Sequence, residues 1–234
     1  MIPRNEYPRP QLVRKQWMCL NGEWDFFIDN GKKYADENPF SDDLFTDRII
    51  VPFCPESRLS GIADIGFMDA VCYRRSFVLP KSFIGKRLLL HFGAVDYYAK
   101  VFVNGIKVGE HKGGYTSFCF DITAAVNDGE NVIVVYAEDD VKSPLQSSGK
   151  QSPEYESFGC FYTRTTGIWQ TVWIEPVNET YIKNFNYICD IENVPLVTFT
   201  VKLDGECIGK TLKAKITYQG RAVGDVSKKC TSTP

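Results

Sequence analysis

The chain has 234 residues, a hydrophobic content of 44% and a formal net charge of −2, which arises from 27 basic and 29 acidic side chains. This length fits one large domain, or one domain plus a smaller unit, and the apolar content is ample for a packed core. Basic and acidic residues are interspersed, which excludes the electrostatic footprint of a protein that binds nucleic acid or an anionic membrane surface.

The N-terminal segment Met1–Pro10 lacks the apolar core of a signal peptide, and no later stretch approaches the length of a membrane span. We therefore expect no membrane association. The chain as given is expected to be cytoplasmic, or periplasmic or secreted if a signal peptide has been removed. Eight scattered cysteines form no CxxC pair, and His91 and His111 lack metal-ligand spacing. The sequence predicts no metal, no cofactor, and thiols rather than disulfides.

Apolar residues with a period of two predict most elements, because successive side chains of a strand point to opposite faces. This alternation occurs at Trp24–Ile28, Tyr73–Leu79 and Ser117–Ile122. Within Val101–Gly109, the pair Asn104-Gly105 predicts a hairpin, since both turn residues accept positive φ.

The segment Asn131–Ala137 is almost wholly apolar and β-branched, which favours a strand buried on both faces in the middle of a sheet. Single helical turns are expected at Phe40–Asp47 and Ala63–Met68, and no window shows a sustained helical period. Many short strands with turn signals between them predict an all-β fold, a two-sheet β-sandwich or jelly roll.

A last strand of this sandwich is expected from Ile168 to Glu175, and Pro176 ends it, so the first domain spans residues 1–177. Residues 178–234 form a second unit. They predict three strands, around Ile182–Asp190, Val197–Leu203 and Thr211–Tyr218. An immunoglobulin-like sandwich needs about seven strands. The second unit is therefore expected to be a partial, truncated domain.

Several segments occur together in an order that is specific as a set. They are Tyr7–Pro10, Leu20–Trp24, Val51–Ser57, Tyr73–Phe77, His91–Asp96, Val103–Gly105, Gly113–Phe118 and Thr163–Gln170. With these segments the chain resembles the N-terminal region of glycoside hydrolase family 2, the group of β-galactosidases, β-glucuronidases and β-mannosidases. The resemblance covers residues from about 7 to 177, and the remainder resembles the start of the family's immunoglobulin-like second domain.

The resemblance implies a galactose-binding-domain-like jelly roll, the sugar-binding domain, that packs against a catalytic (β/α)8 barrel. A retaining glycosidase needs two carboxyl groups about 5 Å apart, one as nucleophile and one as acid/base, and in this family both glutamates come from the barrel. The barrel is not in this chain, so we expect no catalytic residue and no hydrolysis by the chain alone. The implied parent hydrolyses O-glycosyl bonds of β-glycosides in carbohydrate metabolism, and the implied partners are carbohydrate and the barrel.

The resemblance also places loop residues near the barrel's active site. Asp139 and Asp140 follow the buried strand and would contact substrate. The rim of the sugar pocket would be shaped by Lys150, Gln151, Tyr162 and Arg164, within or next to the long polar loop 141–160, and by Glu56 at the tip of the Pro52–Ser57 loop.

Structural alternatives exist for several of these residues. Asp139 and Asp140 can belong to a solvated loop. Arg164 can instead hydrogen-bond loop carbonyls or pair with a carboxylate. Glu56 can sit in an ordinary turn, and Trp169 can serve as core or interdomain packing.

Two other functions compete with the family interpretation. A free-standing carbohydrate-binding module would show a row of exposed aromatics, for which Tyr97, Tyr98, Tyr115 and Tyr155 are candidates, although their spacing forms no evident platform. A structural adhesion-type sandwich would lack ordered polar loops and would not respond to glycans. Separation from the barrel exposes a packing surface, which predicts a homo-oligomer or aggregation.

Overall fold

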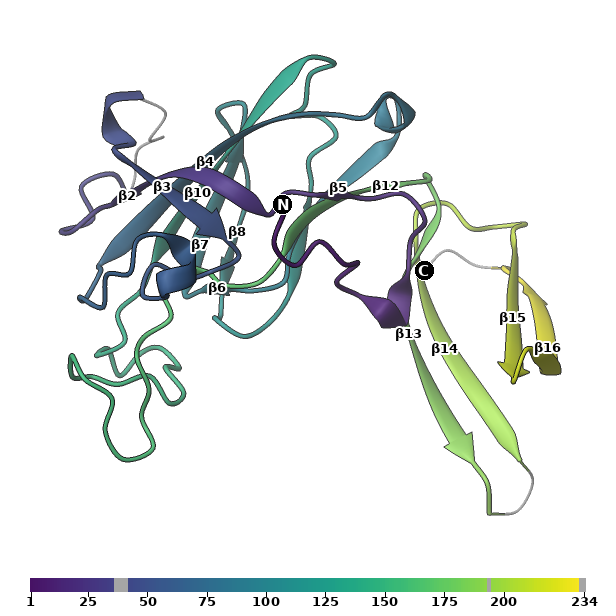
Figure 1. Ribbon diagram of the computed structural model, residues 1–234. Coiled ribbons are helices and arrows are strands. Elements are labelled where there is room, and N and C mark those ends of the chain that lie inside the picture. The colour runs from purple at the N-terminus through teal and green to yellow at the C-terminus, as the bar shows by residue number, and fades with distance from the viewer. Residues whose placement is uncertain (36–41, 193–194, 232–234) are drawn as a thin grey trace. The chain divides into compact units, whose positions relative to one another are not determined.

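The computed structural model describes residues 1–35, 42–192 and 195–231. The chain divides into two compact units, Met1–Pro176 and Val177–Pro234. The boundary lies one residue before the expected domain end at residue 177. The first unit consists of strands joined by loops and short 3-10 helices, and the described residues of the second unit form strands and loops. The all-β prediction is therefore confirmed (Figure 1). Within the described ranges, no helix is long and apolar enough to cross a membrane.

The larger sheet of the first unit contains six antiparallel strands in the order β3-β2-β4-β10-β7-β8. Their bounds are β2 Gly22–Ile28, β3 Asp47–Val51, β4 Ala70–Val78, β7 Tyr98–Val103, β8 Ile106–Lys112 and β10 Glu130–Glu138. Strand β10 pairs with β4 on one side and with β7 on the other. The central position predicted for residues 131–137 is therefore confirmed.

A smaller sheet of four strands, in the order β1-β12-β5-β9, forms the second layer of the sandwich. The bounds are β1 Met18–Cys19, β5 Arg87–Phe92, β9 Phe118–Asp121 and β12 Val172–Val177. Two further short strands, β6 (Val95–Asp96) and β11 (Gly167–Ile168), pair with each other. The 3-10 helices are η1 Pro10–Leu12, η2 Asp42–Leu44, η3 Arg58–Ser60 and η4 Lys81–Phe83.

One apolar core joins the two sheets. Trp24 and Tyr73 of the larger sheet and Leu90, Phe92 and Ile174 of the smaller sheet are at most 1% exposed and belong to the same cluster. Complete burial of such side chains stabilises by about 1.5–3 kcal/mol each. This core fixes the strands whose ends carry the polar loops described below.

The predicted Asn104-Gly105 hairpin is confirmed between β7 and β8, with φ of 49° and 83° at the two turn residues. The Asn104 side chain reinforces the turn. Its Nδ2 donates to the carbonyl of Ala125 and to Asn131 Oδ1, both at 2.8 Å, and its Oδ1 accepts from the Val132 amide at 2.8 Å. The turn is thereby tied to the central strand β10.

The continuous strand expected from Ile168 to Glu175 is wrong. Its residues belong to β11 and β12, which lie in different sheets, and residues 169–171 join them. The Val172 amide donates to Asn21 Oδ1 at 3.0 Å, and the Thr171 carbonyl accepts from the Gly93 amide at 2.9 Å. These bonds direct the chain from β11 into the four-stranded sheet. There, residues 172–177 are all buried, instead of alternating between buried and exposed. Strand β12 also continues through Pro176, which was expected to end it.

Of the two expected helical turns, η2 falls inside Phe40–Asp47, although residues 40–41 lie outside the described residues. The turn expected at Ala63–Met68 is wrong. The Asp64 carboxylate instead accepts the Gly66 amide at 2.7 Å, which favours a local bend. The helical turn occurs earlier, at η3, where Ser57 Oγ accepts the Leu59 amide at 3.2 Å.

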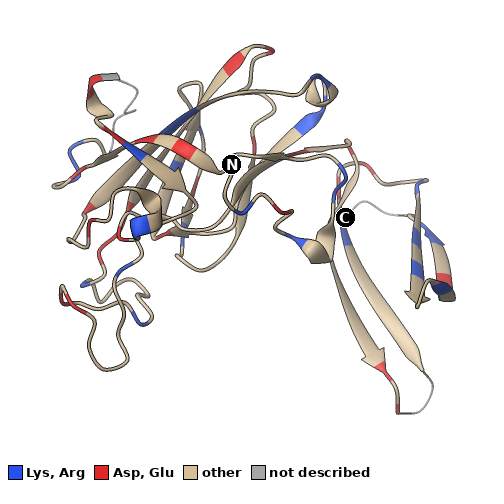
Figure 2. Cartoon of the chain, viewed as in Figure 1, with Lys and Arg blue, Asp and Glu red and all other residues tan. Residues whose placement is uncertain are grey.

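The second unit contains two hairpins, each a separate two-stranded sheet. The strands are β13 Tyr181–Asp190, β14 Leu196–Asp204, β15 Thr211–Tyr218 and β16 Arg221–Lys229. The three predicted strands are confirmed, and β16 was not predicted. The assignment of this unit to an immunoglobulin-like domain stays a prediction. Figure 2 shows basic and acidic residues interspersed along the strands and loops of each unit.

Candidate functional site

Polar side chains from four segments converge where β10 ends. Asp139 follows β10, Asp96 ends β6, Glu56 lies in the loop after β3, and Thr166 precedes β11. Thr166 joins two of the acids, because its amide donates to Glu56 at 3.1 Å and its hydroxyl donates to Asp139 Oδ2 at 3.2 Å. The Asp139 amide also donates to the Asp69 carbonyl at 3.2 Å. The loop ends are therefore fixed by hydrogen bonds to the sandwich.

Burial alters the acidity of all three carboxyl groups. Glu56, Asp96 and Asp139 are 7%, 0% and 5% exposed. Burial raises the pKa of Glu56 to about 7, and burial together with the charge of Asp139 raises the pKa of Asp96 to about 7. Burial also raises the pKa of Asp139. A carboxyl group that retains its proton near neutral pH can donate a hydrogen bond as well as accept one.

Asp96 is the least exposed of the three acids. Its Oδ2 accepts from Gln151 Nε2 at 2.7 Å, whereas its Oδ1 is buried without a hydrogen-bond partner among the described residues. A Cβ at Gly114 would come within 2.2 Å of Oδ1, so only glycine fits there. The Gly114 carbonyl accepts from Trp169 Nε1 at 2.8 Å, which places Trp169 in packing of the loops.

Arg164 adopts the structural alternative expected for it. Its guanidinium donates to the carbonyls of Ser152 (3.3 Å) and Glu154 in the long loop and to the carbonyl of Ile65. It also lies 4.3 Å from the centroid of the Phe67 ring, and the residue is 3% exposed. Arg164 therefore positions the loop around residues 152–155 and does not face solvent.

Gln151 is also a buried cross-link. Besides its bond to Asp96, its Oε1 accepts the Thr165 amide at 2.7 Å. Its neighbours Lys150 and Tyr162 have exposed side chains, and only their backbones pair, with the Tyr162 amide donating to the Lys150 carbonyl at 2.8 Å. The predicted site residues thus fall into a buried group and an exposed group. Glu56, Asp139, Gln151 and Arg164 are buried around β10 and β11, and Asp140, Lys150 and Tyr162 lie at the surface.

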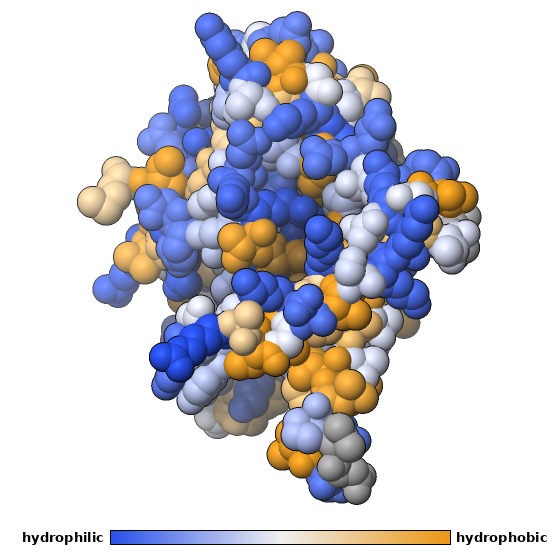
Figure 3. Space-filling model, turned by 90° about the vertical axis from the view of Figure 1, so that its right-hand side faces the viewer, coloured by the Kyte–Doolittle hydropathy of each residue, from blue (hydrophilic) through white to orange (hydrophobic). Residues whose placement is uncertain are grey.

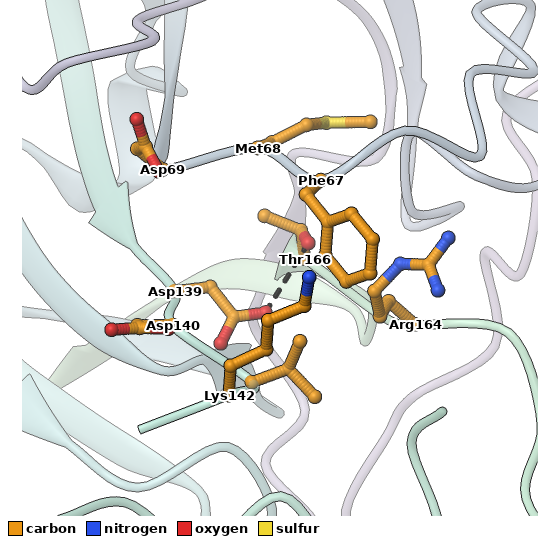
Figure 4. Close-up of a pocket in the computed structure, with 9 residues that line it drawn as sticks. Phe67, Met68, Asp69, Asp139, Asp140, Lys142, Arg164 and Thr166 are labelled. Atoms are coloured by element: carbon orange, nitrogen blue, oxygen red, sulfur yellow. Dashed lines mark hydrogen bonds between the residues drawn. The ribbon is translucent and has the colours of Figure 1, made fainter. Parts of the chain in front are cut away.

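A cavity of ≈ 210 Å³ opens beside Asp139 (Figure 4). It is lined by Phe67, Met68, Asp69, Asp139, Asp140, Val141, Lys142, Arg164 and Thr166. Figure 4 shows the Asp139 carboxyl directed toward Thr166 and the Asp140 carboxyl directed the other way. Lys142 Nζ lies 3.7 Å from the centroid of the Phe67 ring. A second hollow of ≈ 260 Å³ shares Asp139 and Asp140 with the first.

The cavity offers one buried acid, one ammonium group and one aromatic ring to a ligand. Pockets that enclose a whole small molecule usually measure about 300–1,000 Å³. A volume of ≈ 210 Å³ therefore suits contact with part of a ligand. Nothing in the described part of the chain groups three or more His, Cys, Asp or Glu residues in a way that could hold a metal ion.

Three residues of this cluster were not predicted as site residues, although Asp96 and Thr166 lie in segments that carry the family resemblance. Asp96 had a usable signal, since it is an acidic residue directly after the apolar run that ends in Ala94-Val95. Thr166 and Gln146, whose Nε2 donates to Asp139 Oδ1 at 2.6 Å, carry no local pattern. Their role depends on contacts between segments that are distant in the sequence.

Comparisons with known proteins agree with one another. Residues 62–173 match the family model described as "Glycosyl hydrolases family 2, sugar binding domain". A β-galactosidase of Thermoanaerobacter pseudethanolicus is 36% identical over 154 residues, which are 63% of this chain and 20% of the relative. A β-glucuronidase of Paenibacillus borealis is 33% identical over 133 residues, which are 55% of this chain and 22% of the relative.

Solved structures show the same fold. A β-glucuronidase from Ruminococcus gnavus, in complex with a C6-substituted uronic isofagomine, matches with a TM-score of 0.73 and 18% identity over 93% of this chain and 39% of that chain. A β-glucuronidase from an uncultured Clostridium matches with a TM-score of 0.71 and 22% identity, over the same shares of the two chains. The chain spans about a fifth of the length of the curated relatives that it matches.

Proposed function

We propose that this chain, whose residues 62–173 match the family model of the sugar-binding domain of glycosyl hydrolase family 2, is a non-catalytic portion of a glycosidase that hydrolyses β-glycosides. In this proposal the two catalytic glutamates lie on a (β/α)8 barrel outside the chain. The sandwich supports the barrel, and its loops supply side chains to the sugar pocket. Carbohydrate and the barrel are its partners.

The observation that carries the proposal is the partial pocket at Asp139. Its acid is 5% exposed and held by Thr166 and Gln146. The hydroxyl groups of a sugar can both donate and accept hydrogen bonds. A carboxyl group with a raised pKa can accept a hydrogen bond from a hydroxyl group or donate one to it. The small volume fits one edge of a sugar, and another domain would complete its enclosure.

Hydrolysis assays separate this proposal from catalysis by the chain itself. The purified chain is incubated with 4-nitrophenyl β-D-galactoside and 4-nitrophenyl β-D-glucuronide, and release of nitrophenol is recorded. We expect no release above the blank, because the glycosidic mechanism needs two opposed carboxyl groups of defined spacing. Turnover that persists after rigorous repurification would contradict the non-catalytic assignment.

Substitution at the pocket tests its contribution to sugar binding. In the full gene product, Asp139→Asn is expected to raise KM for the preferred glycoside by up to about 10-fold, since one hydrogen bond contributes about 0.5–1.5 kcal/mol. Asp128→Asn is the matched control, because Asp128 is exposed in the turn before β10. An unchanged KM in a folded Asp139→Asn protein would remove Asp139 from the pocket.

The alternative function, a free-standing carbohydrate-binding module, receives support from one feature. Tyr115, Tyr155 and Tyr162 are 53%, 62% and 64% exposed on loops of the first unit. Aromatic rings at a surface can stack on sugar faces. Glycan-array binding by the chain alone, lost on substitution of these tyrosines by alanine, would favour this function over the leading one.

A further inference from the structure

Two cysteines lie next to each other at the base of the β15–β16 hairpin in the second unit. Cys230 follows β16, and its amide donates to the Lys210 carbonyl at 2.8 Å. The Cys230 carbonyl accepts from the Gly209 amide at 3.0 Å. The Lys210 amide donates back to the Cys207 carbonyl at 3.0 Å, which closes a turn over residues 207–210. This turn places Cys207 beside Cys230.

The side chains of Cys207 and Cys230 lie close enough to interact. The Cys207 residue is 2% exposed, and Cys230 is half-buried. No disulfide joins them in the structure. Burial raises the pKa of the Cys207 thiol, and the neighbouring Cys230 sulfur raises it further. Of the two, Cys230 is the more accessible to a reagent.

Reagents can approach Cys230, the half-buried member of the pair. Cys207 and Cys230 both line a hollow of ≈ 900 Å³ between the two hairpins of the second unit. That volume admits a small disulfide molecule. Cys54 differs in this respect, since it is hydrogen-bonded to Glu56 and burial raises its pKa to about 12. Thiol–disulfide exchange requires access and a fraction of thiolate, and the Cys207–Cys230 pair combines access with a second thiol.

We propose that Cys207 and Cys230 form a redox-active pair, which a low-molecular-weight disulfide such as oxidised glutathione converts into an intramolecular disulfide that closes the β15–β16 hairpin. The Cys230 thiolate attacks one sulfur of the reagent, breaks its S–S bond and releases one thiolate. The Cys207 thiolate then attacks Cys230 Sγ of the mixed disulfide and releases the second. The two cysteines are oxidised, the reagent is reduced to two thiols, and the two cysteine protons pass to solvent or to the released thiolates.

The bond would change the behaviour of the hairpin. It would tie residue 207 to residue 230 and restrict the unfolded ensemble of the segment between them. Hairpin opening would then become rarer, and cleavage at Lys213, Lys215 and Arg221, which lie on β15 and β16, should slow in the oxidised protein.

Mass spectrometry of the full chain tests the proposal. The protein is incubated with oxidised glutathione, quenched with acid, and its remaining thiols are alkylated before digestion. We expect a species that lacks two hydrogen atoms, carries two fewer alkyl groups, and yields one peptide pair linked through Cys207 and Cys230. Dithiothreitol should restore the alkylation pattern of the untreated protein.

Substitutions make the test specific. Cys207→Ser should stop the reaction at a glutathione adduct on Cys230, and Cys230→Ser should abolish the linked peptides. Cys189→Ser is the matched control, because Cys189 is an exposed cysteine on β13 in the same unit; it should leave the linkage intact. A wild-type digest that contains only glutathione adducts, or links between other cysteines, would overturn the proposal, and this result does not depend on whether any variant folds.

Discussion

Glu175 fastens the N-terminal segment to the smaller sheet through one fully buried carboxylate. Tyr7 donates its hydroxyl to Glu175 Oε1 at 2.5 Å, and Arg9 and Arg14 reach Oε2 at 3.1 and 2.8 Å. Trp173 Nε1 donates to Oε1 at 2.9 Å. The Tyr7–Pro10 segment, which the sequence offered only as part of a family resemblance, therefore has a physical role in closing the sandwich.

The pKa of Glu175 links this cluster to pH. Burial alone would raise it, but His91 at 3.3 Å, Tyr7 and Trp173 lower it from 4.5 to about 2. A depressed folded-state pKa contributes stability above the unfolded value of 4.5, and this contribution is lost as the pH falls through about 2. The contribution of this group is about 3 kcal/mol at neutral pH.

We predict that Glu175→Gln lowers the free energy of unfolding at neutral pH and flattens its dependence on acid. The wild-type protein should lose more stability than the variant between about pH 5 and pH 2. Urea titrations followed by tryptophan fluorescence measure the difference. Glu130→Gln, at the exposed first residue of β10, is the control and should follow the wild-type curve. Parallel curves for Glu175→Gln and wild type would contradict this account of Glu175.

Asp96 should act in the opposite direction. Its folded-state pKa is raised from 3.8 to about 7, so the folded protein binds a proton that the unfolded chain has lost. Stability from this group is complete below about pH 4 and is lost as the pH rises through about 7. We predict that Asp96→Asn loses less stability than wild type across that range. Equal losses in urea titrations at the two ends of the range would refute the raised pKa.

Arg164 allows a direct comparison between a buried and an exposed guanidinium. Arg164→Ala would leave the buried Ser152 carbonyl without this donor and would also remove the donor to the Ile65 carbonyl. We expect a loss of about 3 kcal/mol in the free energy of unfolding. Arg58→Ala, at an exposed position in η3, should change it by less than about 0.5 kcal/mol. Similar effects of the two substitutions in denaturant titrations would show that Arg164 does not support the loop.

At the scale of elements, local patterns predicted the strands whose own residues determine them. Asn104-Gly105 specifies its turn by positive φ, and the run of β-branched residues in β10 suits its central place in the sheet. Strand β16 had no such pattern, because it includes Gly224 and several charged residues. It forms through pairing with β15 across a turn at Gln219-Gly220, with φ of 46° and 77°.

Local sequence patterns did not reveal the burial and the hydrogen bonds of the site residues. The family resemblance indicated Glu56, Asp139 and Gln151, but not that they are buried and hydrogen-bonded to the sandwich. Thr166 connects Glu56 with Asp139 across 110 and 27 residues of sequence. Contacts at such separations depend on the packing of the whole sandwich, and a period of two in a short window carries no information about them.

The turn between β7 and β8 depends on a glycine with positive φ. Gly105→Ala places a Cβ at φ 83°, which should cost about 1–2 kcal/mol in the free energy of unfolding. Gly129→Ala is the matched control, because a Cβ there meets nothing within 4 Å and its φ is outside the positive region. Thermal or urea unfolding compares the two variants. A Gly129 effect as large as that of Gly105 would show that the turn conformation is not the cause.

At the scale of the whole molecule, exposed apolar residues predict self-association. On the face drawn in Figure 3, hydrophobic side chains gather in patches between hydrophilic ones. In the second unit, Tyr187, Ile188, Ile191 and Tyr218 are at least 62% exposed. Patches of this kind usually mark surfaces that bind a partner. We expect dimers or larger species in multi-angle light scattering as concentration rises, and a monodisperse monomer at high concentration would contradict this.

The most direct test of the central claim is to read the coding DNA immediately downstream of Pro234. We predict a continuing reading frame that completes the second unit and then encodes a β/α-repeating barrel with two catalytic glutamates. Substrate specificity would then be measured on that full product. A stop codon directly after Pro234 would contradict the claim that this chain is part of a family 2 glycosidase with a catalytic barrel.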